Sequence, residues 1–193
     1  EQLRTRYPTL RFLSGEIGVF EPDGGVLVPE RAVEAQLRVA TRAGAHLRFG
    51  TVVRQWEPVG DGFEVLLDDG APISARTLVL AVGPWFAEAL GVPLRIQRNV
   101  QAWFRPAPTA YSAGRFPPFL LERDHFPAPL YGFPDFGDGV KAAFHAHGAI
   151  TTPNELERAI DPARDLAPLA AALEEWMPGT AASFHSAKVC PYT

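Results

Sequence analysis

Cysteine, contiguous positive charge and long apolar runs are all scarce in this sequence. Cys190 is the one cysteine among 193 residues, so no disulfide can form within the chain, and this usage is typical of a reducing cytoplasm. Lysine and arginine form no basic block and the formal net charge is -4, so we expect no nucleic-acid partner. No apolar run is long enough to span a bilayer, and the charged N-terminal stretch has no signal-peptide core, so we expect no membrane association. We also expect no metal site.

The overall composition is that of an ordinary globular protein, with 47% hydrophobic and 21% charged residues. A chain of this length can bury roughly 70% of the surface that its unfolded form exposes, so a true core is possible. The 19 prolines and 17 glycines indicate many turns and exclude a long helical bundle.

The first half of the chain predicts a helix followed by short strands. Pro29 suits a first helical position, residues 30–43 repeat apolar side chains with helical spacing, and Gly44 is a suitable cap. The dipeptide Asp69-Gly70 is typical of a hairpin turn. The predicted strands are His46–Phe49, Thr51–Trp56, Gly62–Leu67 and a fully buried one at Thr77–Val82, with a short helix at Trp85–Leu90 closed by Gly91.

The second half predicts further strands separated by proline and glycine turns, then helices. The strands are Ile96–Phe104, Pro118–Leu121, Leu130–Phe133, Val140–His145 and Ser183–Cys190, and the helices are Asn154–Ile160 and Ala167–Trp176. The fold class is therefore α+β, with a mixed, largely antiparallel sheet and flanking helices.

Two strands place reactive side chains on a common face. Side chains repeat every second residue in a strand, so Lys141, Ala143 and His145 share one face, where the alanine leaves room for a flat ligand. The alternative is a solvated edge lysine and a structural histidine. By the same alternation, Lys188, Cys190 and Tyr192 share a face.

Other interpretations of these residues remain open. Free cysteine is usually a small buried hydrophobe, and no local motif supports a cysteine-peptidase dyad of Cys190 with His145 or His147. The aromatic strand around Tyr131 is typical of a core strand entering a turn. The strand that ends at Gly83-Pro84 would let a ligand approach the backbone closely, as in many α/β proteins.

Five segments together resemble the monomeric sarcosine oxidase family, in the order and with nearly the separations found there. They cover the chain from about residue 10 to 193 and read GGVLVPERAV, TLVLAVGPW, VPLRIQRNVQAWF, LYGFPDFGDGVKAAFHAHG and KVCPYT. The resemblance implies a flavoprotein with an FAD domain and a substrate domain whose sheet covers the flavin. Residues 1–91 would be a partial FAD-domain portion, and residues 92–193 the substrate domain.

The resemblance also implies an activity, oxidation of a secondary amine of a small amino acid. A hydride equivalent passes to the flavin, O₂ reoxidises it to give hydrogen peroxide, and water hydrolyses the imine. Sarcosine, N-methyl amino acids and cyclic imino acids are all possible substrates within the family. From the single cysteine, we expect the protein to be cytoplasmic.

Individual residues match positions of the family. Cys190 resembles the cysteine bonded to the flavin, and Lys188 could favour its thiolate. Lys141 resembles the lysine that activates oxygen by stabilising developing superoxide. Matches of lesser detail are His145, Tyr131 and Tyr192 in the substrate pocket, Val53 beside the adenine, Gly83, Pro84 and Trp85 close to the cofactor, and Arg98, to which we assign no role.

The sequence departs from the family in several places. Ala143 stands where the family usually has glycine, and the turn around Asp138 is one residue shorter. No G-x-G-x-x-G follows a strand, and Gly137-Asp138-Gly139 lacks the third glycine. In the family that fingerprint precedes the region matched here and binds the pyrophosphate, and the final segment, which cradles the flavin ring and the substrate carboxylate, would come after Thr193.

We therefore expect a fragment of an FAD-dependent amine oxidase that binds no FAD and is inactive by itself. The alternative function is a non-catalytic folded module. In either case the uncovered, flavin-facing side of the sheet would expose apolar surface, so we expect self-association.

Overall fold

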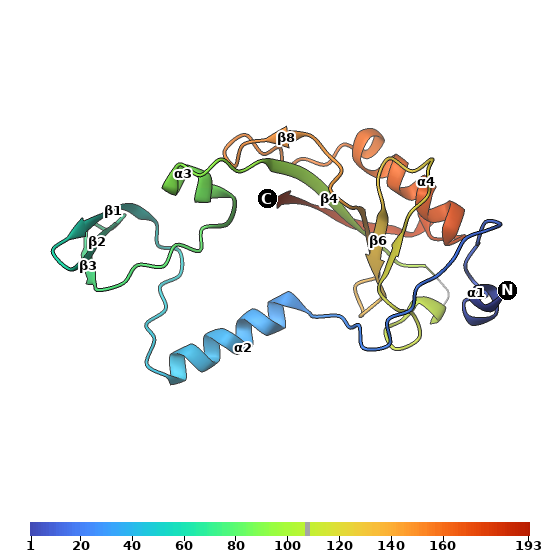
Figure 1. The fold of residues 1–193 in the computed structure, drawn as a ribbon, viewed down its shortest axis with the longest axis horizontal. Helices are drawn as coiled ribbons and strands as arrows, with labels where there is room; N and C mark the ends of the chain where they lie inside the picture. The colour runs from blue at the N-terminus through green and yellow to red at the C-terminus, as the bar shows by residue number, and fades with distance from the viewer. Residues whose placement is uncertain (107–108) are drawn as a thin grey trace. The chain divides into compact units, whose positions relative to one another are not determined.

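The computed structural model describes residues 1–106 and 109–193, and these form two compact units (Figure 1). One unit is Leu27–Val82, and the other combines Glu1–Val26 with Gly83–Thr193. The division into a partial FAD-domain portion and a substrate domain at residues 91 and 92 concerns function and stays a prediction. Helices and antiparallel sheets are mixed, which confirms the α+β class.

The unit Leu27–Val82 holds the predicted helix and hairpin. Pro29 is at the start of helix α2, Gly44 follows it with φ +92, and Asp69-Gly70 turns the chain between two strands. The Asp69 side chain accepts a hydrogen bond from the Ala71 N–H at 2.9 Å, which stabilises the turn. The elements are α2 (Pro29–Arg42) and an antiparallel sheet of β1 (Val53–Val59), β2 (Gly62–Leu67) and β3 (Pro72–Ala75) in that order.

Two of the predicted strands in this unit are wrong. Thr77–Val82 and His46–Phe49 are irregular, and neither segment pairs with another in the part of the chain that the structure describes. The apolar side chains of these segments predicted burial. Val79 is nevertheless 81% exposed and Phe49 76% exposed, so no described part of the chain covers them. An apolar run becomes a strand only where a neighbouring backbone supplies hydrogen bonds.

The larger unit is built on a six-stranded antiparallel sheet around strand β4 (Figure 1). The strand order is β5-β6-β7-β4-β8, and β9 pairs with β4 as well. The bounds are β4 (Ile96–Phe104), β5 (Phe119–Leu121), β6 (Leu130–Phe133), β7 (Val140–Phe144), β8 (Ile150–Thr151) and β9 (Phe184–Tyr192). The strand predictions in this half are therefore confirmed to within two residues at each end, and only the short β8 was missed.

Helix α4 (Ala167–Trp176) packs on one face of this sheet and forms the core with it. Leu173 and Met177 are fully buried, and burial of one such side chain stabilises the fold by roughly 1.5–3 kcal/mol. The strand residues in this core are Ala102, Phe104, Leu130, Val140, Ala142 and Phe144. Because strand side chains alternate, the residues between these ones lie on the opposite face of the sheet.

The N-terminal segment belongs to this unit because a buried arginine holds it there. Arg123 pairs with Glu16 at 2.6 Å and with Glu175 of α4 at 2.5 Å, and it donates to the Arg11 carbonyl at 2.9 Å. The segment starts with a short helix, α1 (Gln2–Arg6), which the sequence pattern did not indicate. Among the described residues, no helix combines the length and the apolar character needed to cross a membrane.

The predicted helix at Asn154–Ile160 is wrong. The segment is a turn followed by irregular chain, and a π-helical turn, η3 (Pro162–Leu166), precedes α4 instead. The carbonyls of Glu157 and Ala159 accept hydrogen bonds from Arg98 of β4, at 2.9 and 2.7 Å, and not from a following helical turn. This long-range contact overrides the local helical pattern.

Candidate functional site

The face of the sheet opposite α4 gathers most of the predicted site residues. In the strand register Lys141 lies between Trp103 and Phe133, and Ala143 is paired with Tyr131. On the other side of β4, Cys190 lies opposite Asn99 and Tyr192 opposite Gln97. Paired residues of an antiparallel sheet point to the same side, so these strands bring Lys141, Tyr131, Cys190 and Tyr192 to one face.

Two tyrosine hydroxyls meet on this face. The Oη atoms of Tyr131 and Tyr192 are 2.7 Å apart, and the Gln101 side-chain amide donates to Tyr131 Oη at 3.3 Å. Burial and the hydrogen bond with Tyr192 raise the pKa of Tyr131 well above its usual range. Tyr131 therefore stays protonated at neutral pH and can donate a hydrogen bond.

His145 completes this aromatic group. It follows β7 directly, and its ring centroid is 6.1 Å from that of Tyr131 and 6.0 Å from that of Tyr192, both in edge-on contact. The imidazole is exposed, whereas the two tyrosines are half-buried. A histidine ring thus lies at the solvent side of the tyrosine pair.

Lys141 is held between two aromatic rings. Its Nζ atom lies 5.5 Å from the Trp103 ring centroid and 5.4 Å from the Phe133 ring centroid, within the range of cation–π attraction. Strand β7 lies between β6 and β4, and Lys141 is half-buried. The alternative of a solvated edge lysine is therefore wrong.

Ala143 is fully buried, so its neighbours on the sheet already cover it. The alternation in the sequence had indicated that a flat ligand would lie against this alanine. On this face such a ligand would instead lie over the half-buried side chains of Lys141 and Tyr131.

Cys190 is a free, half-buried thiol on the same face. Among the described residues, the hydrogen-bond contact of its Sγ atom is with the Pro191 carbonyl, at 3.9 Å, and neither His145 nor His147 bonds to it. The dyad that a cysteine peptidase needs is thus not formed there. The exposed Lys188 lies two residues before Cys190 on this face, opposite Gln101.

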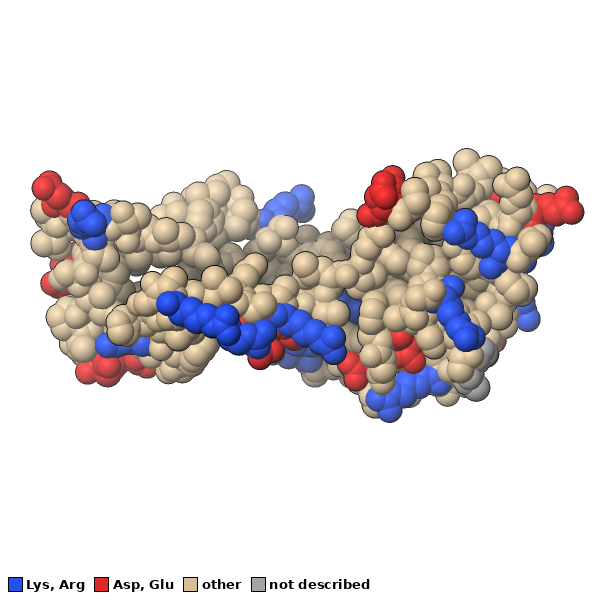
Figure 2. Space-filling model, turned by 90° about the horizontal axis from the view of Figure 1, so that it is seen from below, with Lys and Arg blue, Asp and Glu red and all other residues tan. Residues whose placement is uncertain are grey.

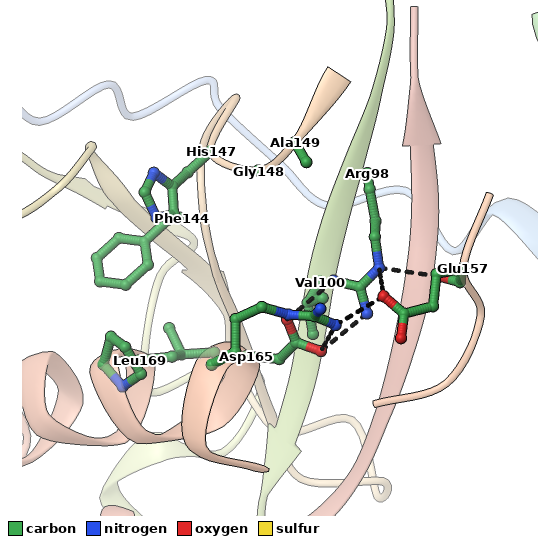
Figure 3. A pocket seen from close by; sticks show the side chains of 11 residues that line it. Arg98, Val100, Phe144, His147, Gly148, Ala149, Glu157, Asp165 and Leu169 are labelled. Atoms are coloured by element: carbon green, nitrogen blue, oxygen red, sulfur yellow. Dashed lines mark hydrogen bonds and ion pairs between the residues drawn. The ribbon is translucent and has the colours of Figure 1, made fainter. Parts of the chain in front are cut away.

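Arg98 points to the other side of β4. Figure 3 shows its guanidinium against Asp165, with which it makes two hydrogen bonds of 2.8 Å. Burial disfavours ionisation of Asp165, but hydrogen bonds from Arg98 and Arg164 outweigh it and hold the pKa of Asp165 well below its usual range. The four charges here, which include Glu157, pair with one another at the wall of a pocket of about 250 Å³. Arg98 therefore fastens the loop before α4 to the sheet.

The remaining predicted cofactor residues lie elsewhere. Gly83, Pro84 and Trp85 form a 3₁₀ turn, η1 (Gly83–Trp85), which leads into helix α3 (Phe86–Leu90). The Trp85 indole donates to Asn154 at 3.4 Å, and Gly83 has φ +54 with no atom where a Cβ would lie. Val53 opens strand β1 and belongs to the unit Leu27–Val82. Gly83, Pro84 and Trp85 are thus not part of the sheet face.

The sequence reasoning missed three residues that contact Tyr131 or Lys141 on this face: Gln101, Trp103 and Phe133. All three lie in predicted strands, and alternation along β4 predicts that Gln101 and Trp103 lie on the face opposite Arg98. The sequence does not predict which residues they contact, because these contacts depend on which strands pair with β4. Groups of three or more possible metal ligands are absent from the described part of the chain.

Comparison with known proteins assigns a family to this arrangement. The model of the FAD-dependent oxidoreductase family matches residues 1–192. Monomeric sarcosine oxidase of Streptomyces avermitilis is 31% identical over 100% of this chain and 52% of its own length. N-methyl-L-tryptophan oxidase of Salmonella typhi is 31% identical over 98% of this chain and 51% of its own length.

A solved structure agrees with these relatives. NikD, described as an unusual amino acid oxidase essential for nikkomycin biosynthesis, superposes with a TM-score of 0.82 at 25% identity, over 98% of this chain and 50% of its own. The chain thus spans about half the length of the curated relatives it matches. The sequence, the antiparallel sheet and the family model all lead to one conclusion: the chain belongs to the FAD-dependent oxidoreductase family.

Proposed function

We propose that the protein containing this chain is an FAD-dependent oxidase of secondary amines of small amino acids. The observation that carries the proposal is the sheet face opposite α4, where a tyrosine pair, a histidine, a lysine held between aromatic rings and a thiol meet. Relatives named sarcosine oxidase and N-methyl-L-tryptophan oxidase support the substrate class.

The residues of this face fit the ring end of FAD. Half-buried aromatic side chains, a fixed cation and a thiol suit a flat, electron-accepting ring that becomes negatively charged. No described residue belongs to a glycine-rich turn between a strand and a helix, which the pyrophosphate end would need. When bound, FAD would accept the electrons and hydrogen removed from the substrate C–N bond.

Each side chain on the face has a role in this proposal. Tyr131, Tyr192 and His145 orient the substrate through hydrogen bonds and ring contacts. Trp103 and Phe133 hold the Lys141 ammonium in place, where its charge can stabilise negative charge on reduced oxygen. Cys190 is the candidate for covalent attachment of the flavin, assisted by the nearby cation Lys188.

The isolated 193-residue chain is a second case, for which we propose a non-catalytic module that binds no flavin and self-associates. Exposed apolar side chains support this, among them Ile17, Val19 and Val79, which are 90%, 95% and 81% exposed. Figure 2 shows broad areas without charged side chains between interspersed positive and negative ones. Size-exclusion chromatography of the chain should give a species larger than a monomer, and a monomer alone would contradict the proposal.

The deciding experiment compares the complete protein with the isolated chain. Each is incubated with FAD and gel-filtered, its visible flavin absorbance is recorded, and peroxide formation is followed with sarcosine, N-methyl amino acids and cyclic imino acids. We expect the complete protein to be yellow and to oxidise at least one of these amines, and the isolated chain to be colourless and inactive. A complete protein that binds FAD but oxidises no secondary amine would refute the substrate class.

A further inference from the structure

The chain that follows strand β7 bulges away from β4 before it pairs with β4 again as β8. Ala142 lies opposite Ala102 in the first pairing, and Ile150 lies opposite Gln97 in the second. The two registers differ by three residues, so the chain between them, which begins with His145, forms a bulge. Bulges beside active sites serve to aim a particular side chain.

The bulge segment, residues 145–149, contains a backbone conformation that alanine rarely adopts. Ala146 has φ +50, in the left-handed region where a Cβ is unfavourable, and among the described residues other than glycine no second one has a positive φ. Such residues cluster at functional sites and persist only where surrounding contacts hold them. Because Ala146 directly follows His145, contacts that hold its conformation also fix the His145 backbone.

Two side chains of β4 supply these contacts. The Asn99 Oδ1 atom accepts a hydrogen bond from the His147 N–H at 3.2 Å, and the Gln97 Nε2 atom donates to the Gly148 carbonyl at 2.9 Å. Both side chains lie on the sheet face that carries Tyr192, which is opposite Gln97 in the register. The bulge segment is thus held from the face on which His145 lies.

Asn99 destabilises the fold in one respect, which makes its contact with the bulge segment informative. The side chain is 0% exposed, and its Nδ2 atom has no hydrogen-bond partner among the described residues. A buried amide with one group unsatisfied is less favourable than an apolar side chain of similar size. Its recorded side-chain hydrogen bond is the one from the His147 N–H, so the polar atom at this position serves the bulge segment.

The His145 ring depends on this backbone for its orientation. The ring is exposed, it is in edge-on contact with the tyrosine pair, and none of the described residues forms a recorded hydrogen bond with it. Resting on the proposed function, we propose that Asn99, assisted by Gln97, is a positioning residue: it holds Ala146 in the left-handed conformation and so keeps the His145 ring beside the tyrosine pair, where the amine substrate binds.

Replacement of Asn99 by leucine tests the proposal in the complete, FAD-loaded protein. Leucine keeps the approximate size and removes the acceptor. The first readout is the His145 ring resonance in NMR spectra of protein with labelled histidine, identified by its loss in His145→Ala, and it needs no turnover. We expect Asn99→Leu to move this resonance toward that of an unstructured histidine, because the ring leaves the two tyrosines. The second readout is the rate of anaerobic flavin reduction by the amine.

A double-mutant cycle with Ala146→Gly separates positioning from a general loss of stability. Glycine adopts the left-handed region without steric cost, so in its presence the turn no longer needs Asn99. We expect Asn99→Leu to slow flavin reduction about tenfold, the cost of one alanine in the left-handed region. In the Ala146→Gly background the loss should be much smaller and the His145 resonance restored. In the His145→Ala background Asn99→Leu should have no further effect on the rate.

Thr180→Val is the matched control. Thr180 is also 0% exposed and has a side-chain Oγ1 atom without a partner among the described residues, but it follows helix α4 and does not contact the bulge segment. Its replacement should leave both readouts unchanged. If Asn99→Leu does not fold, Gln97→Leu replaces it, because Gln97 is only half-buried. It should move both readouts in the same direction by a smaller factor.

Several results would overturn the inference. These are an unmoved His145 resonance in folded Asn99→Leu or in Gln97→Leu, a loss of rate that is equal in the Ala146→Gly background, or a further loss in the His145→Ala background. A protein that oxidises amines but shows one of these results retains the proposed function and loses this inference. A protein in which the resonance moves and is restored as expected, but which oxidises no amine, retains the role of Asn99 in placing His145 and loses the proposed function.

Discussion

Replacement of Asp165 by asparagine should destabilise the larger unit more than any exposed charge change. Asparagine keeps the shape of the side chain but removes the anion closest to the Arg98 guanidinium, whose side chain is 9% exposed, and leaves it, among the described residues, only Glu157 at 3.9 Å. Two hydrogen bonds of 2.8 Å from Arg98 lose their charged acceptor, and the Asp161 N–H loses a carboxylate partner at 2.9 Å. Breaking a buried ion pair from one side costs about 3–5 kcal/mol, and the retained amide oxygen places Asp165→Asn near the lower end of this range.

The assay is urea unfolding of the chain at neutral pH, followed by circular dichroism. We expect Asp165→Asn to lower the free energy of unfolding by about 3 kcal/mol. Glu34→Gln is the control, because it breaks the exposed pair of Glu34 with Arg38 on α2, whose side chains are 66% and 56% exposed. An exposed pair of this spacing contributes about 0.2–0.5 kcal/mol.

The pH dependence gives a second check with a definite sign. The pKa of Asp165 is lower in the folded protein than the unfolded value of roughly 4, so its contribution is fully present above that unfolded value. It is lost as the pH falls toward the folded pKa. The difference between wild type and Asp165→Asn should therefore be constant above about pH 5 and shrink in acid. A loss no larger than that of Glu34→Gln, or a difference that grows as the pH falls, would refute the reasoning.

Three further predictions concern packing and the cofactor. Gly148→Ala should destabilise the fold by more than Gly50→Ala in thermal unfolding, because its Cβ would collide with the Arg98 carbonyl oxygen, whereas a Cβ at Gly50 meets nothing within 4 Å. Equal losses would contradict this. Leu173→Ala should cost about 2–5 kcal/mol of unfolding free energy, since the side chain is 0% exposed in the core, and a loss below this range would mean that the core collapses around the gap. Under the proposed function, Cys190→Ala in the complete protein should release yellow FAD on acid precipitation, and a wild type that already releases it would remove the covalent assignment.

The sequence predicted most accurately the elements that depend only on the spacing of residues close together in the chain. Strand β4 and helix α4 have the predicted bounds, because Ile96–Phe104 alternates within itself and Ala167–Trp176 is flanked by turn residues. The shared face of Lys141 and His145 likewise requires only alternation along one strand. Thr77–Val82 shows the limit, since an apolar run does not reveal whether another strand will pair with it.

Long-range contacts account for what the sequence could not predict. The segment at Asn154–Ile160 has a helical pattern, but Arg98 binds its carbonyls across about 60 residues of chain. Gln101 carries no motif and becomes visible as a site residue only when β7 and β9 are paired with β4, which brings Tyr131 and Tyr192 beside it.

The contacts on the two faces of strand β4 restrict where residues can be inserted or deleted in related chains. Arg98 fastens the loop before α4 on one side of the strand, and Gln101 supports the tyrosine pair on the other. Inserting or deleting one residue between them would reverse the side on which one of the two points, because the side-chain period of a strand is two. Loops around the sheet can lengthen without this penalty. Related chains should therefore keep the spacing of three residues between the positions of Arg98 and Gln101, even where other residues occupy these two positions.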